Sequence, residues 1–346
     1  MNPGVSRVGK VRVPRLRVGR ALVAVLALAV GATVAPGRST LAADKKEAPA
    51  DQIVISGASG GLAGETLSEL LARGVPFKRL ILVTRTPEKL ASFVERGAQV
   101  RLGDFTKPET LPTAFAGGRQ LLLISTNEGD RVAQHTAAIN AARRAGIKHI
   151  VYTSWINATE DNPAAVASDH HLTEEALKRS GVPFTILRNQ QYADGLISRG
   201  AKAIATGQLI TNAGRGKWAP VVRADCAAAA AAVLTQPGQE GKTYDITGPD
   251  LISEQDFAQL LIEITGKPVR VVYVDDDAYV ANAVQTGVPE PLARINATFG
   301  FAIRANFLNI KSETLQILIG RKPKSLRELL TANQAALLPA SSTTKR

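Results

Sequence analysis

Hydrophobic positions along the chain alternate between short β-branched runs and longer stretches with helical spacing. The strand-like runs are 52–56, 80–84, 99–102, 120–125, 149–153 and 184–187. The helical patterns between them are 62–73, 87–96, 110–115, 130–145 and 168–180, and several are followed by a glycine. This alternation predicts an α/β fold, a doubly wound parallel sheet with right-handed crossovers and a ligand crevice at the carboxyl ends of its strands.

The alternation loosens after about residue 189, where glycine and polar residues become more frequent. We predict a return to the sheet through a helix at 224–234 and a strand at 243–246, so the first domain spans 52–249. Residues 250–332 contain further helical patterns and one strand-like run, 269–274. They are expected to form a smaller mixed α/β lobe on the substrate side of the crevice. Residues 333–346 are expected to be a flexible tail.

The first 43 residues differ in composition from the rest of the chain. Residues 1–43 contain seven Arg or Lys residues and no Asp or Glu. A basic stretch precedes the apolar run 21–35 and the small-residue site 40–43, a pattern typical of a secretory signal, with 44–51 as a polar linker. It predicts a periplasmic or secreted protein. An uncleaved membrane anchor or a transit peptide stays open, and with it a cytoplasmic or membrane-associated location.

The net charge of +12 does not predict a nucleic-acid partner. Without the seven basic residues of 1–43 the remainder has 35 basic and 30 acidic residues, and no basic block with interleaved aromatics. A single cysteine, Cys226, excludes an intramolecular disulfide, and the four histidines lack the spacing of metal ligands, so we expect no metal site. The oligomeric state, a homodimer included, is left open.

The glycine-rich segment that follows the first strand-like run predicts a pyrophosphate site. Gly57 permits a tight turn, Gly60 permits close approach of phosphates, and small Ala63 and Gly64 allow the next helix to pack close to the strand. The helix N-terminus offers unpaired N–H groups and the positive end of its dipole. Such a turn is typical of a dinucleotide-binding Rossmann domain, although an ordinary strand-to-helix turn is the alternative. The predicted cofactor contacts are Gly57, Ala58, Ser59, Gly60, Gly61 and Leu62.

Arg85 stands at the end of the second strand, with Lys89 one helical turn further on. Folds that select the unphosphorylated dinucleotide usually place Asp or Glu here to bind the ribose 2′-OH. A guanidinium instead matches a phosphate and pairs with it bidentately. The sequence therefore favours NADP(H) over NAD(H). The alternative is that Arg85 is a solvated loop charge.

The ends of the next strands supply further candidates. Asp104 follows the third strand, where it is expected to meet the adenine amino group, with Phe105 beside the ring. Polar side chains at the ends of the fourth and fifth strands suit the diphosphate and the nicotinamide ribose. These residues are Ser125, Thr126, Asn127 and Thr153. The alternatives are a plain Gly-Asp turn and ordinary capping of strand ends.

One expected catalytic pair is missing. Typical short-chain reductases activate a carbonyl with a tyrosine whose pKa is lowered by a lysine four residues later, and none of the five tyrosines here has that lysine. His171 and Glu175 are one turn apart on the predicted helix 168–180, so the carboxylate is placed to orient the imidazole. The alternative is a capped helix start with solvated charges.

Several segments resemble the NmrA-like atypical short-chain dehydrogenase/reductases. They are 55–62, 83–85, 123–126, 141–154 and 184–192, while 223–229 and 318–323 resemble the bacterial NAD(P)H:quinone oxidoreductase type 2 branch. The resemblance covers about 52–332. It implies that NADPH is held by 57–62, Arg85, 125–127 and the loop 189–194, which contains Asn189, Gln190, Gln191 and Tyr192. Gln190 and Gln191 replace the glycine-aromatic pair typical of the family, which puts the substrate in doubt.

The resemblance and the missing Tyr/Lys pair together indicate an NAD(P)H-dependent reductase that passes hydride to a quinone or a similar small electron acceptor. A quinone accepts hydride without a strong protein acid, so positioning by Asn189 and Tyr192, with His171 as a further catalytic candidate, is expected to suffice. Two alternatives remain at this point. One is a non-catalytic module that senses NAD(P), and the other is an assembly protein associated with a membrane through its N-terminus.

Overall fold

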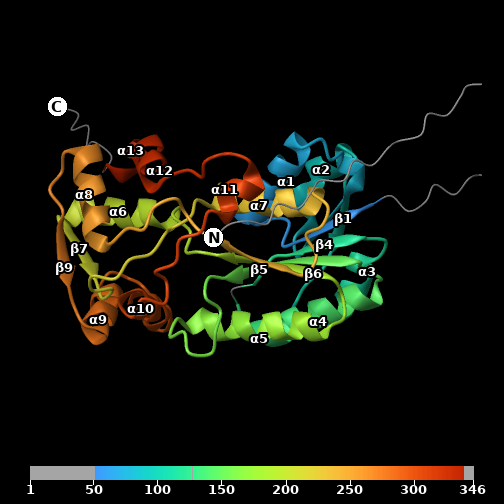
Figure 1. The fold of residues 1–346 in the computed structure, drawn as a ribbon, viewed down its shortest axis with the longest axis horizontal. Coiled ribbons are helices and arrows are strands. Elements are labelled where there is room, and N and C mark those ends of the chain that lie inside the picture. The colour runs from blue at the N-terminus through green and yellow to red at the C-terminus, as the bar shows by residue number, and fades with distance from the viewer. Residues whose placement is uncertain (1–50, 127, 339–346) are drawn as a thin grey trace, which may run out of the picture. The chain divides into compact units, whose positions relative to one another are not determined.

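The computed structural model describes residues 51–126 and 128–338, which belong to one compact unit. Its main sheet has seven strands in the order β3-β2-β1-β4-β5-β6-β8, all parallel (Figure 1). The strands are β1 (Ile53–Ser56), β2 (Leu80–Thr84), β3 (Gln99–Leu102), β4 (Gln120–Leu123), β5 (His149–Trp155), β6 (Phe184–Asn189) and β8 (Lys242–Ile246). The strand order reverses between β1 and β4, which confirms the predicted doubly wound sheet and creates the crevice at its carboxyl edge.

Helices cover both faces of this sheet (Figure 1). They are α1 (Gly61–Ala72), α2 (Ala91–Glu95), α3 (Leu111–Phe115), α4 (Arg131–Arg144), α5 (Ala165–Arg179), α7 (Arg223–Thr235) and α11 (Thr314–Ile319), with short 3₁₀ helices at Phe77–Arg79, Pro87–Leu90 and Pro108–Thr110. Ile53 and Ile55 pack in the cluster beneath α1, α7 and α11, while Val54 between them packs beneath α3, α4 and α5. Burial on both faces explains why the central strands β1, β2 and β4 are largely apolar, whereas the edge strands β3 and β8 carry more polar residues.

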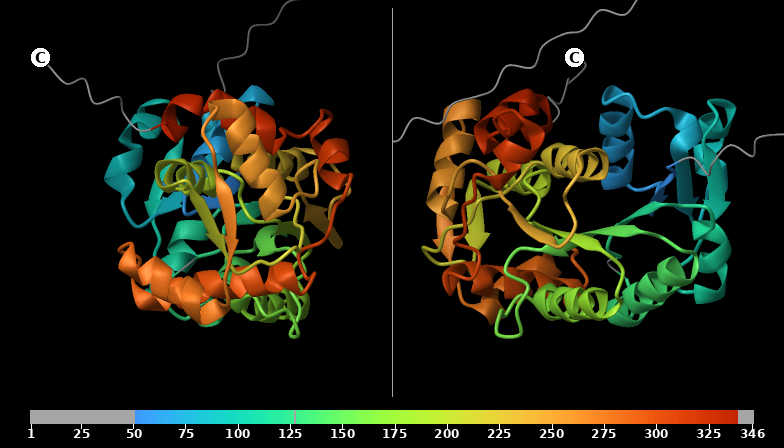
Figure 2. Two further views of the ribbon diagram at one scale, coloured as in Figure 1. Left: turned by 90° about the vertical axis from the view of Figure 1, so that its left-hand side faces the viewer. Right: turned by 45° about the vertical axis from the view of Figure 1, so that its right-hand side comes forward.

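A second, smaller sheet belongs to the lobe beside the crevice. Its two parallel strands are β7 (Gln208–Thr211) and β9 (Arg270–Tyr273), which Figure 2 shows side by side. The helices around it are α6 (Gly195–Thr206), α8 (Glu254–Thr265), α9 (Asp276–Gln285), α10 (Glu290–Arg304), α12 (Leu326–Ala332) and α13 (Gln334–Leu337). The core of the lobe includes Leu196 and Trp218 together with Phe257 and Leu330, so it uses chain from both sides of residue 249.

The flexible tail expected from residue 333 is wrong for its first residues. Residues 334–337 form α13, and Leu337 is fully buried in the core of the smaller lobe. The physical reason is close packing on α6, where a Cβ added to Gly200 would lie 3.2 Å from a Leu337 methyl carbon. The predicted signal 1–43 and all but the last residue of the linker 44–51 lie outside the described residues. No helix in the described part of the chain is long and apolar enough to cross a membrane.

Replacement of Leu337 tests whether α13 belongs to the folded core. Leu337→Ala should lower the free energy of unfolding by about 2–5 kcal/mol, because it removes buried methyl groups and leaves a cavity. Leu292→Ala on α10 is the matched control, since that leucine is 49% exposed and should cost far less. Urea denaturation measures both. Equal losses in the two variants would show that α13 does not contribute to the core.

Candidate functional site

A cavity of about 270 Å³ lies at the carboxyl ends of β1, β2, β3 and β4. Its lining comes from the four loops that follow these strands and from the first turns of α4. The lining residues are Gly57, Ser59, Gly60, Val83, Thr84, Arg85, Gly103, Asp104, Phe105, Thr106, Ile124, Ser125, Thr126, Glu128 and Gln134. Eight of the seventeen predicted cofactor contacts are therefore brought together in one crevice, at the switch point of the sheet.

The glycine turn between β1 and α1 has the geometry of an anion site. Gly57 has φ +61°, a left-handed conformation that favours glycine, and its carbonyl accepts a hydrogen bond from the Gly60 amide at 2.8 Å. A Cβ on Gly60 would lie 3.1 Å from that carbonyl. Gly60 is the N-cap of α1 and offers no capping side chain, and the first turn of α1 has no acidic residue. The N-terminal amides of α1 are thus available to a phosphate.

Three of the six predicted glycine-turn contacts have other roles in the structure. The Ala58 amide donates to the Val83 carbonyl at 2.9 Å, and the Leu62 side chain is buried in the core. A Cβ on Gly61 would lie 3.1 Å from the guanidinium carbon of Arg223. Ala58 thus bonds the turn to β2, Leu62 packs in the core, and Gly61 leaves space for the Arg223 side chain of α7. Gly57, Ser59 and Gly60 line the crevice.

Arg223, which sequence reasoning did not identify, joins three helices beside this turn. Its guanidinium donates to both carboxylate oxygens of Glu65 on α1, at 2.8 and 3.1 Å. Its backbone amide donates to the side chain of Asp194, the residue before α6, at 2.8 Å. The start of α7 is thereby tied to α1 and to the loop that follows β6. The missed signal is the position of Arg223 at the start of the alanine-rich helix.

The crevice contains charges of both signs where the adenosine half of a dinucleotide is expected. Arg85 is 60% exposed and forms an ion pair with Glu128 at 3.4 Å. An Asp104 oxygen accepts hydrogen bonds from the backbone and hydroxyl of Thr106 at 2.9 and 2.8 Å. Burial alone would raise the pKa of Asp104, but these hydrogen bonds and the charges of Arg85 and Lys107 lower it below its ordinary value. Asp104 is therefore a carboxylate at neutral pH.

The loop after β4 is held by hydrogen bonds from its neighbours. The Ser125 amide donates to the Thr153 hydroxyl at 2.9 Å, and the Thr126 amide donates to Nε2 of His135 at 3.0 Å. Thr153 is 2% exposed and does not line the crevice. Thr153 therefore matches the alternative interpretation, in which the polar side chains cap strand ends: its hydroxyl accepts from the Ser125 amide. Asn127 lies outside the described residues.

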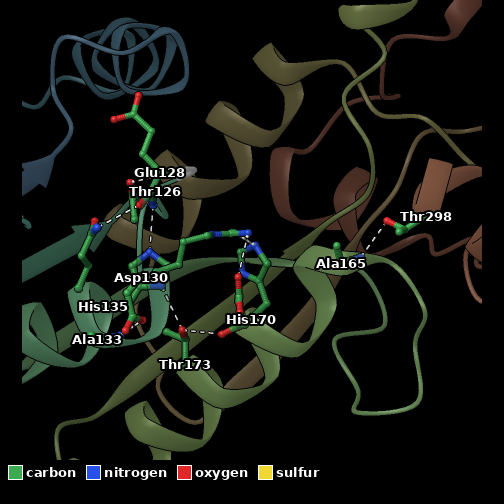
Figure 3. Close-up of polar contacts among 12 residues, drawn as sticks. Thr126, Glu128, Asp130, Ala133, His135, Ala165, His170, Thr173 and Thr298 are labelled. Carbon is green, nitrogen blue, oxygen red and sulfur yellow. Dashed lines mark hydrogen bonds and ion pairs between the residues drawn. The ribbon is translucent and has the colours of Figure 1, made fainter. Parts of the chain in front are cut away.

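His135 belongs to a buried polar network between β5, α4 and α5 (Figure 3). Because its Nε2 accepts from Thr126, its proton lies on Nδ1, which donates to the Thr173 hydroxyl at 3.0 Å. Burial, with the nearby charge of Arg131, lowers the pKa of His135 to about 3. The imidazole is therefore neutral at physiological pH.

His170 occupies the other end of the same network. Its Nε2 accepts from the Arg131 guanidinium at 2.8 Å, so Nδ1 carries the proton and donates to the Tyr152 oxygen at 2.8 Å. Burial, followed by the charge of Arg131, lowers the pKa of His170 well below its ordinary value. The neutral His170 on α5 is thus hydrogen-bonded to Arg131 of α4 on one side and to Tyr152 of β5 on the other.

The predicted pairing of His171 with Glu175 does not form. Glu175 accepts a hydrogen bond from Lys178 at 2.8 Å and pairs with Arg179 at 3.7 Å, and no hydrogen bond joins it to His171 in the described structure. His171 lines neither the crevice nor the cavity described next. Glu175 therefore pairs with basic residues of α5, and the capped helix start of the alternative interpretation does not form, because α5 begins at Ala165 without a capping side chain. The histidine with structural consequences is its neighbour, His170.

A second cavity, of about 200 Å³, lies beside the loop that follows β6. Its lining residues are Gln191, Tyr192, Gly195, Leu196, Arg199, Thr211, Asn212, Trp218, Glu254, Tyr279, Asn296, Phe299, Gly300 and Ile303. Asn189, at the end of β6, donates from Nδ2 to the Tyr192 hydroxyl at 3.3 Å, while its Oδ1 is buried and has no partner among the described residues. Gln191 and Tyr192 thus line this cavity, and Asn189 contacts it through the Tyr192 hydroxyl.

Gln190 is a correction to the predicted cofactor contacts. Its side chain is fully buried and donates to the Leu308 carbonyl at 3.1 Å, away from the cavity lining. Its side-chain oxygen accepts from the Gln191 amide at 3.1 Å. Successive residues of an extended strand end point to opposite sides, so Gln190 anchors the segment after α10 while Gln191 faces the cavity.

The lining of this cavity contains buried polar atoms that sequence reasoning did not identify. Arg199 and Glu254 form an ion pair at 2.9 Å, and the Glu254 side chain is 3% exposed. Glu254 Oε2 and Trp218 Nε1 are buried without a hydrogen-bond partner in the described part of the protein. Phe299 packs against Trp155 with ring centroids 5.4 Å apart. Unsatisfied buried polar groups are rare in proteins, and here they gather with aromatic rings around one cavity, as in a ligand site.

Comparison with known proteins agrees with this geometry. Residues 57–237 match the family described as NAD(P)H-binding. Quinone oxidoreductase 2 of Escherichia coli (strain K12) is 36% identical over 80% of this chain and 96% of its own length. The crystal structure of the NADPH-dependent quinone oxidoreductase QOR2 of Escherichia coli with NADPH superposes with a TM-score of 0.79 and 34% identity. It covers 82% of this chain and 100% of that chain.

Two further relatives are reductases of other acceptors by name. The triphenylmethane reductase of Citrobacter sp. complexed with NADP(H) has a TM-score of 0.76 and 38% identity, covering 82% of this chain and 99% of that one. The NAD(P)H azoreductase of Xenophilus azovorans is 28% identical over 82% of this chain and 98% of its own length.

The buried neutral histidines predict a specific dependence of stability on pH. A histidine whose pKa is lowered by folding takes up a proton more readily in the unfolded state, so stability falls as pH drops below about 6.5. Between about pH 6 and pH 5, His135 should contribute a loss of up to about 1.4 kcal/mol per pH unit. His135→Gln should flatten the slope by up to that amount.

Urea denaturation at several pH values measures this slope for both proteins. Between about pH 7.5 and 8.5, above the titration of histidine, the two stability curves should run parallel. An unchanged slope at pH 5–6 in His135→Gln would contradict a neutral buried His135.

Proposed function

The chain belongs to the NmrA-like family of NAD(P)H-binding oxidoreductases, and we propose that it transfers hydride from NADPH to a quinone or a similar flat electron acceptor. The observation that carries this proposal is the uncapped N-terminus of α1 above the left-handed Gly57 turn, at the switch point of the sheet. It offers backbone N–H groups to a pyrophosphate where this fold class binds dinucleotides.

The crevice fits the two halves of a dinucleotide in different ways. Gly57, Ser59 and Gly60 would hold the pyrophosphate, while Asp104 and Phe105 suit the adenine. Ser125 and Thr126 line the part of the crevice next to β5 and would hold the nicotinamide ribose. The cavity at Gln191 and Tyr192 lies beyond them along the same edge of the sheet. When bound, the reduced nicotinamide supplies the hydride.

A preference for the 2′-phosphorylated cofactor is supported by Arg85. Its guanidinium lines the crevice directly after β2 and is 60% exposed, where dinucleotide folds that select NAD place an acidic residue. A phosphate accepts two parallel hydrogen bonds from a guanidinium, so Arg85 would favour NADP(H) over NAD(H).

The cavity beside the β6 loop is the proposed acceptor site. Phe299 and Trp218 offer flat apolar walls, while Gln191, Tyr192 and Arg199 offer hydrogen bonds to carbonyl oxygens. Burial raises the pKa of Tyr192, so its hydroxyl stays protonated and can donate a hydrogen bond without being a strong acid. Such a site suits an acceptor that is electrophilic by itself, as a quinone is, with water as the source of the proton.

Export through residues 1–43, to the periplasm or out of the cell, is supported by the sequence pattern of that segment alone. The alternative proposal is membrane association through the same segment, which rests on its apolar run 21–35. An exported protein would need a supply of reduced cofactor outside the cytoplasm.

Arg85→Ala should erase most of the proposed preference for NADPH. The loss of a charge-assisted contact to the 2′-phosphate should weaken NADPH binding by about 1.5–3 kcal/mol and leave NADH binding nearly unchanged. Isothermal titration of both cofactors measures the effect, and Arg119→Ala, an exposed arginine paired with Asp51, is the matched control. Equal affinity of the unmutated protein for the two cofactors would refute the preference.

The acceptor cavity makes a second prediction, on catalysis. Asn189→Ala and Tyr192→Ala should lower kcat/KM for quinone reduction more than His171→Ala, which should cost tenfold or less. The reason is that Tyr192 lines the acceptor cavity and Asn189 donates to its hydroxyl, whereas His171 lies outside both cavities. The loss of a general acid–base would instead cost about 10²–10⁴-fold. Steady-state NADPH oxidation with a panel of quinones measures the three variants. A collapse of activity in His171→Ala with unchanged NADPH affinity would overturn this ranking.

A further inference from the structure

The arginine that is proposed to bind the 2′-phosphate already has an anionic partner in the structure. Glu128 Oε2 lies 3.4 Å from a terminal guanidinium nitrogen of Arg85, and both residues line the dinucleotide crevice. The two side chains are 60% and 68% exposed, so the pair is open to solvent and to ligands. A phosphate that binds Arg85 in the bidentate manner uses two guanidinium nitrogens, and one of the three, Nη1, already donates to this carboxylate.

The position of Glu128 is fixed by the first turns of α4. The Glu128 carbonyl accepts from the Gln134 side chain at 3.0 Å, and its amide donates to the Thr126 hydroxyl at 3.4 Å. Asp130 caps α4 by accepting from the Ala133 amide at 2.9 Å, and His135 holds the Thr126 amide (Figure 3). Figure 3 also shows the Glu128 side chain pointing away from His135 and His170. The backbone is thus anchored on the α4 side while the carboxylate extends towards Arg85.

A second carboxylate, that of Asp104, interacts electrostatically with the same guanidinium. Asp104, after β3, lies close enough for the charge of Arg85 to help lower its pKa, and Lys107 acts on it as well. The Asp104 carboxylate is held by Thr106, however, whereas the Glu128 carboxylate has Arg85 as its hydrogen-bond partner. Of the two acidic side chains, Glu128 is therefore the one whose partner would change when a phosphate binds.

We infer that Glu128 is a specificity-determining residue that competes with the cofactor 2′-phosphate for Arg85. The inference rests on the proposed function, since it takes Arg85 as the phosphate contact. In the cofactor-free protein the Glu128 carboxylate neutralises Arg85. Binding of the NADPH phosphate through Nη1 of Arg85 breaks this pair and places the phosphate near the displaced carboxylate. NADH carries no 2′-phosphate and leaves the pair intact. Glu128 thus narrows the difference in affinity between the two cofactors.

The test measures dissociation constants of NADPH and NADH for the full chain by isothermal titration. Glu128→Gln keeps the size of the side chain and removes its charge. It should tighten NADPH binding by about two- to fivefold, the range expected for an exposed ion pair, and leave NADH binding unchanged. The gain should shrink as salt is raised from about 0.01 M to 1 M, because exposed charges are screened.

Two further variants separate the possible outcomes. Glu290→Gln removes a carboxylate from a similarly exposed Glu–Arg pair on α10, and should change neither affinity. In an Arg85→Ala background, Glu128→Gln should lose its gain, because the competition needs both partners. Unchanged or weaker NADPH binding by Glu128→Gln, in a protein where Arg85→Ala does reduce NADPH affinity, overturns the inference alone. Failure of the unmutated protein to bind either cofactor overturns the proposed function instead.

Discussion

The site depends on one constraint, the left-handed backbone at Gly57. With φ at +61° the chain leaves β1 and enters α1 within four residues, which aims the uncapped end of the helix at the sheet edge. The neighbours preserve this arrangement. Ala58 is bonded to β2, and Gly61 leaves room for Arg223, which ties α1 to α7 through Glu65. Without this turn the crevice would lose its proposed site for the cofactor charge.

Polar groups in the interior serve two different purposes. Around His135 and His170 all four ring nitrogens have partners, and the buried atom there without a partner among the described residues is Nε of Arg131. The network fixes the loop after β4, while burial keeps both imidazoles neutral. Around the second cavity, Glu254 Oε2, Trp218 Nε1 and Asn189 Oδ1 lack partners in the described structure. Satisfied networks rigidify a fold, whereas unsatisfied groups beside a cavity are available to a ligand. The contrast separates the scaffold from the proposed acceptor site.

The sequence predicted the main sheet because its central strands are largely apolar runs buried on both faces, a pattern visible one segment at a time. The edge strands β3 and β8 are more exposed. The sequence missed β7, whose partner β9 lies some sixty residues later, since pairing at that distance leaves no local signal. Gly57 and Gly60 were found because glycine in a turn has a local cause. The sequence did not show that Gln190 is buried while Gln191 faces the cavity, or that His170 and not His171 joins the buried network. Which of two neighbouring residues is buried depends on elements that are distant in sequence.

The central claim is that the dinucleotide crevice and the cavity beside Tyr192 together perform hydride transfer. The most direct measurement is the stoichiometry of NADPH oxidised and hydroquinone formed when purified protein is mixed with NADPH and a quinone without other reductants. The account predicts one hydroquinone for each NADPH consumed, with one proton taken up from water, and no NADPH consumption without protein. Tight NADPH binding without quinone-dependent oxidation would contradict the account, and would identify a protein that senses the dinucleotide without turning it over.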